Sequence, residues 1–203
     1  MKTIGYNLLV EIEKETEDTI NVGGKDLFFD GEFNPLYTAR RHGVVVGTNE
    51  KLEKIGLKVG RKVHFHHFVP LESNETEYHL SHKLDIVSSE DSKVYEANVH
   101  PSSTQVYAYE DENGDVHTLY DYLFVEPVIN EIPKTESGIY LGYEEKEEVE
   151  VGIIRYLNKS GETIGLSVGD RVRFAKDSEY DMEIKGETLY RMTNDDIYFV
   201  YGE

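Results

Sequence analysis

Short runs of alternating apolar and polar residues recur along the chain, and they predict strands. A strand with one buried face has a period of two residues and favours Val, Ile, Thr, Tyr and Phe. Such runs cover residues 4–13, 43–46, 63–65, 83–87, 94–112, 116–125, 188–192 and 196–201. No run has the period of an amphipathic helix, and residues 48–54 are predicted to be a short connection. The sequence therefore predicts an all-β protein.

One eleven-residue pattern occurs twice, at Ile55–Phe65 and again 109 positions later at Ile164–Phe174. In each copy a Gly-Leu-x-Val-Gly stretch leads into Val-x-Phe. The glycines suit turn positions that need a positive φ, and the alternation after them suits a strand with one buried face. The pattern predicts the same turn and the same strand at two places in the chain.

The segments that flank this pattern repeat as well, and in the same order. Gly43–Val46 corresponds to Gly152–Arg155, Leu8–Glu11 to Leu123–Glu126, and Val106–Tyr109 to Ile197–Val200. The offsets of these pairs are 109, 115 and 91 positions, so the first copy has 6 extra residues before Gly43 and 18 extra between Phe68 and Asn98. Constant register in core-like stretches with length changes in loops indicates one fold encoded twice.

The repeat divides the 203 residues into two domains of a size common for small folds. The first is predicted at 1–112 and the second at 114–203, with Asn113-Gly114 as a hairpin or junction turn. The first domain also has a polar insertion at about 69–93, where a possible strand at 83–87 suggests an extra hairpin. We expect two tandem small β-barrels.

Two segments without a regular pattern occupy the same place in each copy, at residues 14–40 and 130–150. Each contains a small apolar cluster after glycine, Leu27-Phe28-Phe29 in the first and Ile139-Tyr140-Leu141 in the second. Such a cluster either folds back onto its own barrel or serves as a linear motif that becomes ordered on a partner. Its occurrence in both copies, despite different loop lengths, favours binding.

Composition removes several classes of function. The chain has no cysteine, which excludes a disulfide framework, a thiolate zinc site and a cysteine nucleophile. Its net charge of −19 argues against a nucleic-acid partner, and the acidic run Glu144–Glu150 lacks the pattern of a calcium loop. No apolar run reaches 18 residues, and the amino-terminal residues have no apolar core of a signal peptide. We expect a cytoplasmic protein with no membrane contact.

Histidines are the only constellation that suggests catalysis. His64 and His66 point to one face of a predicted strand, as in cupin-type metal enzymes, so a metal-dependent β-barrel enzyme is one alternative. Val63 and Phe65 occupy the buried face, which places the histidines on an exposed one. The second copy has Arg173 in place of His64, and the chain contains no nucleophile elbow, P-loop or dinucleotide-binding motif. We therefore predict no catalytic residues, no metal and no cofactor.

Five segments of the second copy together resemble the GroES (chaperonin-10) co-chaperonin family. They are Leu119–Val125, Ser137–Leu141, Gly152–Ile154, Leu166–Phe174 and Asn194–Val200. Residues 116–203 match nearly the whole family domain in order, and residues 3–112 match it more loosely, with the two insertions. The doubled domain resembles the tandem chloroplast co-chaperonins.

The resemblance implies small β-barrels that form a homo-oligomeric ring and cap the open end of a GroEL-type chaperonin, whose ATP or ADP state controls binding. An apolar tripeptide in a mobile loop of each domain would enter a groove between two helices of the chaperonin. In the second copy the tripeptide is Ile139-Tyr140-Leu141 after Gly138. In the first, the family's glycine pair corresponds to Gly23-Gly24, but Lys25-Asp26 follow, so the cluster is displaced to Leu27-Phe28-Phe29.

The chain also departs from the family pattern. Only 12 residues separate Gly43 from Gly56, and 12 separate Gly152 from Gly165, so there is little room for the hairpin that roofs the family's ring. An open dome resembles some bacteriophage co-chaperonins, and a phage protein would act in the host cytoplasm. Two domains per chain allow rings of six, eight or mixed domains. The main alternative is a barrel that keeps the fold as a binding or structural module without a chaperonin.

Overall fold

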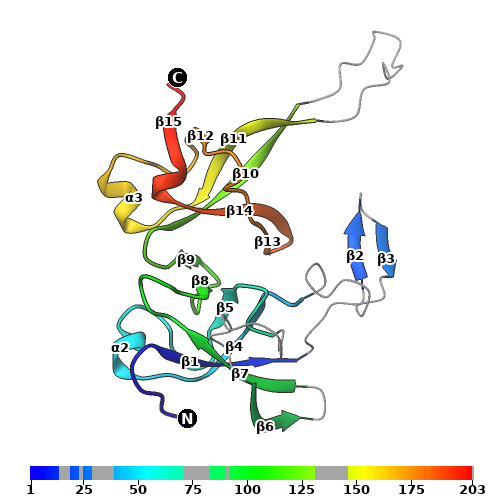
Figure 1. The fold of residues 1–203 in the computed structure, drawn as a ribbon, viewed down its shortest axis with the longest axis vertical. Coiled ribbons are helices and arrows are strands. Elements are labelled where there is room, and N and C mark those ends of the chain that lie inside the picture. Colours follow the sequence, from blue (N-terminus) through cyan, green and yellow to red (C-terminus); the bar gives the residue numbers. More distant parts are fainter. Residues whose placement is uncertain are drawn as a thin grey trace. The chain divides into compact units, whose positions relative to one another are not determined.

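The computed structural model describes residues 1–13, 19–22, 25–28, 39–70, 83–89, 92–130 and 146–202. The chain divides into two compact units, Met1–Leu119 and Tyr120–Glu203. The described residues form antiparallel sheets of seven, six and two strands, with only short helices, so the prediction of an all-β fold is confirmed (Figure 1). None of the described helices is long and apolar enough to cross a membrane.

The first unit contains a seven-stranded sheet in the order β6-β7-β1-β4-β5-β8-β9. Its strands are β1 (Asn7–Ile12), β4 (His42–Gly47), β5 (Lys62–Phe65), β6 (Lys83–Ser89), β7 (Ser92–Asn98), β8 (Val106–Glu110) and β9 (Val116–Thr118). Helix α2 (Glu50–Glu53) joins β4 to β5. A separate two-stranded sheet pairs β2 (Thr19–Val22) with β3 (Lys25–Phe28).

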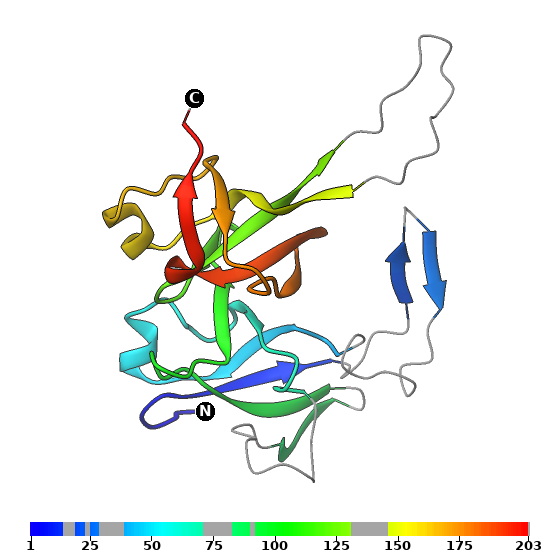
Figure 2. The ribbon, with the colours of Figure 1, turned by 45° about the horizontal axis from the view of Figure 1, so that its top comes forward.

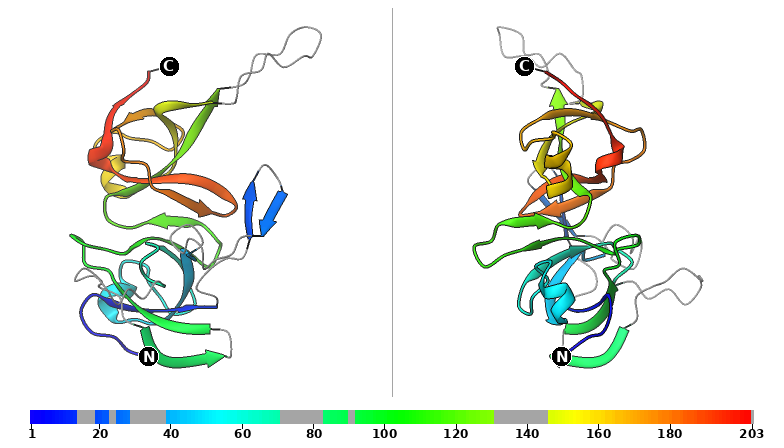
Figure 3. Two further views of the ribbon diagram at one scale, coloured as in Figure 1. Left: turned by 45° about the vertical axis from the view of Figure 1, so that its right-hand side comes forward. Right: turned by 90° about the vertical axis from the view of Figure 1, so that its left-hand side faces the viewer.

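The second unit contains a six-stranded sheet in the order β13-β14-β10-β11-β12-β15. Its strands are β10 (Tyr122–Asn130), β11 (Lys146–Tyr156), β12 (Arg171–Phe174), β13 (Asp181–Ile184), β14 (Glu187–Thr193) and β15 (Ile197–Val200). Helix α3 (Lys159–Thr163) joins β11 to β12, and the 3-10 helix η1 (Asn194–Asp196) precedes β15. Figures 2 and 3 show how the strands of each unit curve around an interior.

The two sheets have the same strand order, and their pairing registers agree. The first six strands of one order correspond in sequence to the six of the other, and β9 is an addition to the first unit. Gly43 pairs with Val63 as Gly152 pairs with Val172, and Val10 pairs with Tyr95 as Val125 pairs with Tyr190. The offsets read from the sequence therefore coincide with equivalent places in the two sheets.

The core of each unit comes from the apolar positions that the alternation selects. Val63 and Phe65 are fully buried in the first unit, as are Val172 and Phe174 in the second. In the second unit Leu123, Val125, Ile154, Leu166 and Met192 complete the same buried cluster. The predicted buried face of the repeated Val-x-Phe strand is confirmed.

The repeated turn has the backbone that its glycines predict. The φ angles of Gly56 and Gly60 are +100° and +87°, and both Gly165 and Gly169 have +95°. The turn closes in the same way in both units, because the Gly60 amide donates to the Val45 carbonyl and the Gly169 amide donates to the Ile154 carbonyl, each at 2.8 Å. Left-handed backbone of this kind favours glycine over any residue with a Cβ.

Three features differ from the sequence analysis. Residues 48–54, predicted as a short connection, contain α2. The helix is capped by Asn49, whose side chain accepts a hydrogen bond from the Lys51 amide at 3.0 Å. The sequence did not indicate this helix because four residues are too few to show a helical period. The predicted extra hairpin is not extra, because β6–β7 corresponds to β13–β14. Residues 116–125 form two strands, separated at Tyr120, where φ is +56°.

The Asn113-Gly114 turn joins β8 to β9, and Gly114 has a φ of +82°. The hairpin turn predicted there is confirmed. Strand β9 pairs with β8 and so belongs to the sheet of the first unit, whereas the domain boundary predicted from the repeat places residues 116–118 in the second domain.

Alanine substitutions in the turns separate backbone strain from a steric clash. A Cβ at Gly60 or Gly165 meets no atom within 4 Å, so Gly60→Ala and Gly165→Ala should each cost only the left-handed strain of about 1–2 kcal/mol. A Cβ at Gly56 would lie 2.1 Å from Cζ of Tyr109, so Gly56→Ala should lower the free energy of unfolding further. Urea unfolding of the three variants measures this order, and equal losses would contradict it.

Candidate functional site

The predicted binding segments leave each sheet at the same place. Residues 14–38 connect β1 to β4 in the first unit, and residues 131–145 connect β10 to β11 in the second. Strands β1 and β4 are paired neighbours in their sheet, as β10 and β11 are in theirs. Both segments therefore emerge between corresponding strands.

The described residues include only part of the predicted contact set. Leu27 and Phe28 lie in β3, opposite Ile20 and Thr19 of β2. Phe29 lies outside the described residues, as do the four predicted contact residues of the second unit, Gly138, Ile139, Tyr140 and Leu141. The predicted binding role of all seven residues stays a prediction.

The strands that carry the second segment extend as a ribbon. Ile129 pairs with Glu147 and Asn130 with Lys146, after an irregularity in the pairing that includes Glu150, whose φ is +61°. Two ion pairs tie β11 to β12: Arg171 contacts Glu148 at 2.5 Å, and Arg173 contacts Glu150 at 2.9 Å. The segment 131–145 thus begins and ends on paired strands (Figure 2).

Strand β15 exposes apolar side chains on both of its faces. Tyr198 is 67% exposed and Phe199 is 49% exposed, and Val200 and Tyr201, which directly follows β15, are each 39% exposed. Within the described residues β15 pairs only with β12, so its other edge has no strand beside it. An open edge that carries exposed aromatic side chains can accept a further strand.

The corresponding strand of the first unit is covered. Strand β8 corresponds to β15, and its Val106, Tyr107 and Ala108 are buried. Strand β9 pairs along its outer edge, with Ala108 opposite Thr118 and Tyr109 opposite His117. Within the described residues the two units thus differ at this edge: the edge of β8 is paired with β9, and the equivalent edge of β15 is open.

Side-chain contacts hold β9 in place. One oxygen of the Asp111 carboxylate accepts hydrogen bonds from the Asn113 and Asp115 amides, both at 2.9 Å, and the other lies 3.0 Å from Nε2 of His117. The bond with His117 lowers the pKa of Asp111 to about 2. The ring of His117 also stacks on Tyr109, with the ring centroids 5.0 Å apart.

His64 is buried, which corrects the prediction that it lies on an exposed face. Its side chain is 1% exposed, and Nε2 lies 3.0 Å from Oε1 of Glu110, which also contacts Lys62 Nζ at 3.1 Å. Burial lowers the pKa of His64 to about 4, so the ring is neutral and donates from Nε2. Burial raises the pKa of the Glu110 carboxyl, but its hydrogen bonds with Lys62 and His64 keep it below the usual value.

The alternative of a metal site on His64 and His66 is not supported by the contacts that these two side chains make in the structure. Nδ1 of His66 accepts from the Phe68 amide at 3.2 Å, while His64 is bonded to Glu110. No group of three or more His, Asp or Glu side chains suited to a metal occurs among the described residues. His79 and His82 lie outside them.

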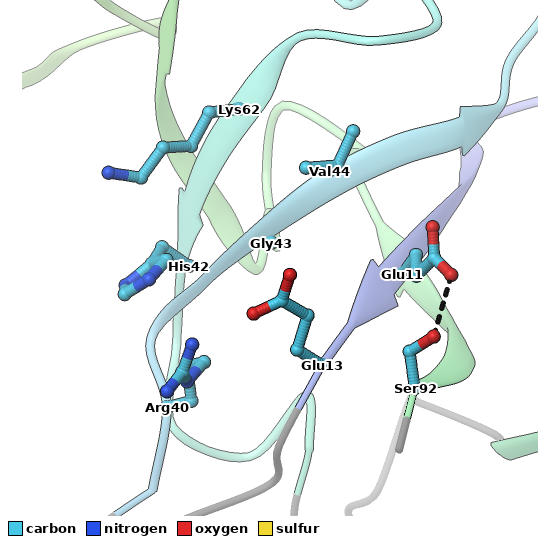
Figure 4. Close-up of a pocket in the computed structure, with 8 residues that line it drawn as sticks. All are labelled: Glu11, Glu13, Arg40, His42, Gly43, Val44, Lys62 and Ser92. Atoms are coloured by element: carbon cyan, nitrogen blue, oxygen red, sulfur yellow. Dashed lines mark hydrogen bonds between the residues drawn. The ribbon is translucent and has the colours of Figure 1, made fainter. Parts of the chain in front are cut away.

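A cleft of about 450 Å³ lies beside β4 in the first unit. Figure 4 shows Arg40, His42 and Lys62 along one side, Glu13 in the middle, and Glu11 on the other side, where it accepts from Ser92 Oγ at 2.9 Å. Burial lowers the pKa of His42 to about 4, so its ring adds no charge. The cleft thus has Arg40 and Lys62 on one side and the carboxylates of Glu13 and Glu11 in the middle and on the other side, so its lining combines both signs of charge.

The buried histidines make the first unit sensitive to acid. The folded pKa of His64, about 4, lies below the unfolded value of 6.5, so the unfolded chain binds more protons between these values. The stability of the first unit should fall as the pH drops from 7 to 5, and His64→Gln should reduce that slope by about 1.4 kcal/mol per pH unit. Hydrogen exchange resolved by unit measures it. The second unit has no histidine and is the internal control; equal slopes in both units would contradict the assignment.

Comparison with known proteins identifies the family. The model of the family described as Chaperonin 10 Kd subunit matches residues 115–201. Co-chaperonin GroES of Rickettsia typhi (strain ATCC VR-144 / Wilmington) is 37% identical over 87 residues, which cover 39% of this chain and 90% of that protein. Co-chaperonin GroES of Rickettsia canadensis (strain McKiel) is 35% identical over 86 residues, with the same coverage.

These matches confirm the predicted resemblance, and the family match includes β9 and the β10–β15 sheet of the second unit. The relatives are co-chaperonins, and this confirms the prediction that the protein is not an enzyme. The chain belongs to the chaperonin 10 family.

Proposed function

We propose that this protein is a tandem co-chaperonin, with two chaperonin-10 domains in one chain, that caps a GroEL-type chaperonin in the cytoplasm and assists protein folding. The observation that carries the proposal is the equivalence of the two sheets. The family match covers residues 115–201, which include the whole sheet of the second unit, and the sheet of the first unit has the same strand order and pairing register. An equal scaffold in both units supports an equal role for both.

The predicted loops are the parts that would bind the chaperonin. They join corresponding strands, and each combines an apolar cluster with polar surroundings. A loop that becomes ordered on docking loses conformational entropy, so a single loop binds weakly. Several loops linked in one assembly gain affinity through effective concentration while each contact stays reversible. The nucleotide state of the chaperonin would then control capture and release.

Assembly would use the open edge of β15. The offset of 115 that relates Leu8–Glu11 to Leu123–Glu126 also relates Met1–Thr3 to Val116–Thr118, which is β9. Since β9 covers β8 within one chain, Met1–Thr3 of a second copy would cover β15 in the same register, with Thr3 opposite Phe199. Repetition of this joint closes a homo-oligomeric ring of six, eight or mixed domains.

The chaperonin-binding proposal is tested by capture on a GroEL-type ring in the presence of ATP or ADP. We expect capture of the wild-type chain and its loss in the double variant Ile139→Asp with Leu141→Asp, because two charges would have to enter an apolar groove. Thr135→Asp with Ser137→Asp adds the same charge to the same segment and should leave capture intact. Absence of wild-type capture would favour the alternative of a barrel module that no longer engages a chaperonin.

The assembly proposal is tested by native mass spectrometry. Phe199→Asp, or removal of residues 1–3, should shift the protein from a ring to single chains, because each change weakens the strand-to-edge joint. Val149 is 78% exposed and lies on β11, away from this edge, so Val149→Asp is the matched control. A wild-type monomer at working concentration, or a ring unaffected by both changes, would refute the joint.

A further inference from the structure

The first residues of the chain are held against their own unit by Asn49 and by the backbone that follows β4. The Thr3 amide donates to the Thr48 carbonyl at 2.9 Å. Nδ2 of Asn49 donates to Oγ1 of Thr3 at 3.0 Å and to the Gly5 carbonyl at 3.2 Å. Thr3 is 9% exposed as a result, whereas the next residue, Ile4, is 87% exposed.

Residues 1–4 correspond to residues 116–119 by the offset of 115 positions, and the backbone bends at the same place after both stretches. Gly5 has a φ of +69°, and Tyr120 has a φ of +56°. Residues 116–118 are β9, which covers the edge of β8. The two stretches therefore have a common local structure, and only the second has an edge to cover within its own chain.

Ile4 lacks the cover that its equivalent has. Leu119 is 3% exposed, and its amide donates to the Tyr107 carbonyl at 2.8 Å. Tyr107 corresponds to Tyr198 of β15 by the offset of 91, and these two residues are 3% and 67% exposed. Ile4 and Tyr198 are thus exposed where the equivalent Leu119 and Tyr107 are buried.

The backbone hydrogen bonds are compatible with a joint at Ile4. Successive amides of an extended strand point to opposite sides. The Thr3 amide donates to its own unit, so the Ile4 amide points to the other side. A β15 strand from a second copy on that side would offer the Tyr198 carbonyl, just as β8 offers the Tyr107 carbonyl to Leu119.

Asn49 uses the two ends of its amide group for different contacts. Its Oδ1 accepts from the Lys51 amide at 3.0 Å and caps α2, while its Nδ2 holds the amino-terminal strand. The equivalent Asn158 caps α3 in the same way, but its Nδ2 donates to the Tyr122 carbonyl at 2.8 Å and to Oδ1 of Asn194 at 2.9 Å. The hold on a strand before the bend is particular to Asn49.

We propose that Asn49 is a positioning residue for assembly: its Nδ2 holds residues 1–4 as an extended strand, so that Ile4 pairs with Tyr198 of a second copy. The inference rests on the assembly part of the proposed function. Strand β9 needs no such hold, because the turn at Asn113-Gly114 ties it to β8. A strand that pairs with another molecule gains affinity when it is ordered beforehand.

The variant Asn49→Ser separates the two contacts. Serine caps a helix about as well as asparagine, but it has no amide group to reach Thr3 and Gly5. The free energy of unfolding of the first unit should stay near the wild-type value. The protein concentration at which half of the chains form rings should rise about tenfold or more in native mass spectrometry. Gly60→Ala, which strains a turn outside these contacts, should lower stability and leave ring formation unchanged.

Amide hydrogen exchange gives a readout that stability alone does not move. In wild-type rings the amides of Thr3 and Ile4 should both be protected, whereas in wild-type single chains only the Thr3 amide should be. In single chains of Asn49→Ser neither amide should be protected.

Two results would overturn the inference and leave the assembly proposal standing. One is a ring of wild-type affinity in Asn49→Ser, and the other is an equal weakening of the ring by Gly60→Ala, since that result would assign Asn49 a general structural role. A wild-type chain that forms no ring would overturn both.

Discussion

Each unit depends on one point where two strands approach more closely than a side chain allows. At Gly43 a Cβ would lie 2.5 Å from the Glu11 carbonyl oxygen, and at Gly152 it would lie 2.2 Å from Cγ1 of Val125. Gly43 lies in β4, which pairs with β1, and Gly152 lies in β11, which pairs with β10. The predicted loops start from these strand pairs, so the close approach positions the predicted binding segments as well as the core.

On this shared scaffold the two units carry different additions. The first has the buried His64 bonded to Glu110, which also contacts Lys62, and the covering strand β9; the second has Arg173 in the place of His64 and, within the described residues, an open β15 edge. The proposed assembly depends on this difference: β9 covers the edge of β8, whereas within the described residues the equivalent edge of β15 has no strand beside it.

The sequence predicts the parts that local chemistry determines. The turn glycines and the Val-x-Phe core positions follow from φ preference and alternation, and both are found. His64 was misplaced because alternation assigns a face but not its cover, and its partner Glu110 comes from β8, 46 positions away. The helices and the β2–β3 hairpin are too short for a clear period. The apolar clusters in the loops stand out because they follow glycine in both copies, whereas the role of Ile139-Tyr140-Leu141 as the chaperonin contact comes from the resemblance.

The central claim is that both units act as equivalent chaperonin-10 domains. Electron cryomicroscopy of the protein bound to an ADP-loaded GroEL-type ring tests it most directly. The account predicts a ring in which each chain contributes two barrels of the same strand order, with density from both loop segments reaching the chaperonin. A complex in which only the second unit lies on the chaperonin, with the first unit outside the ring, would contradict it.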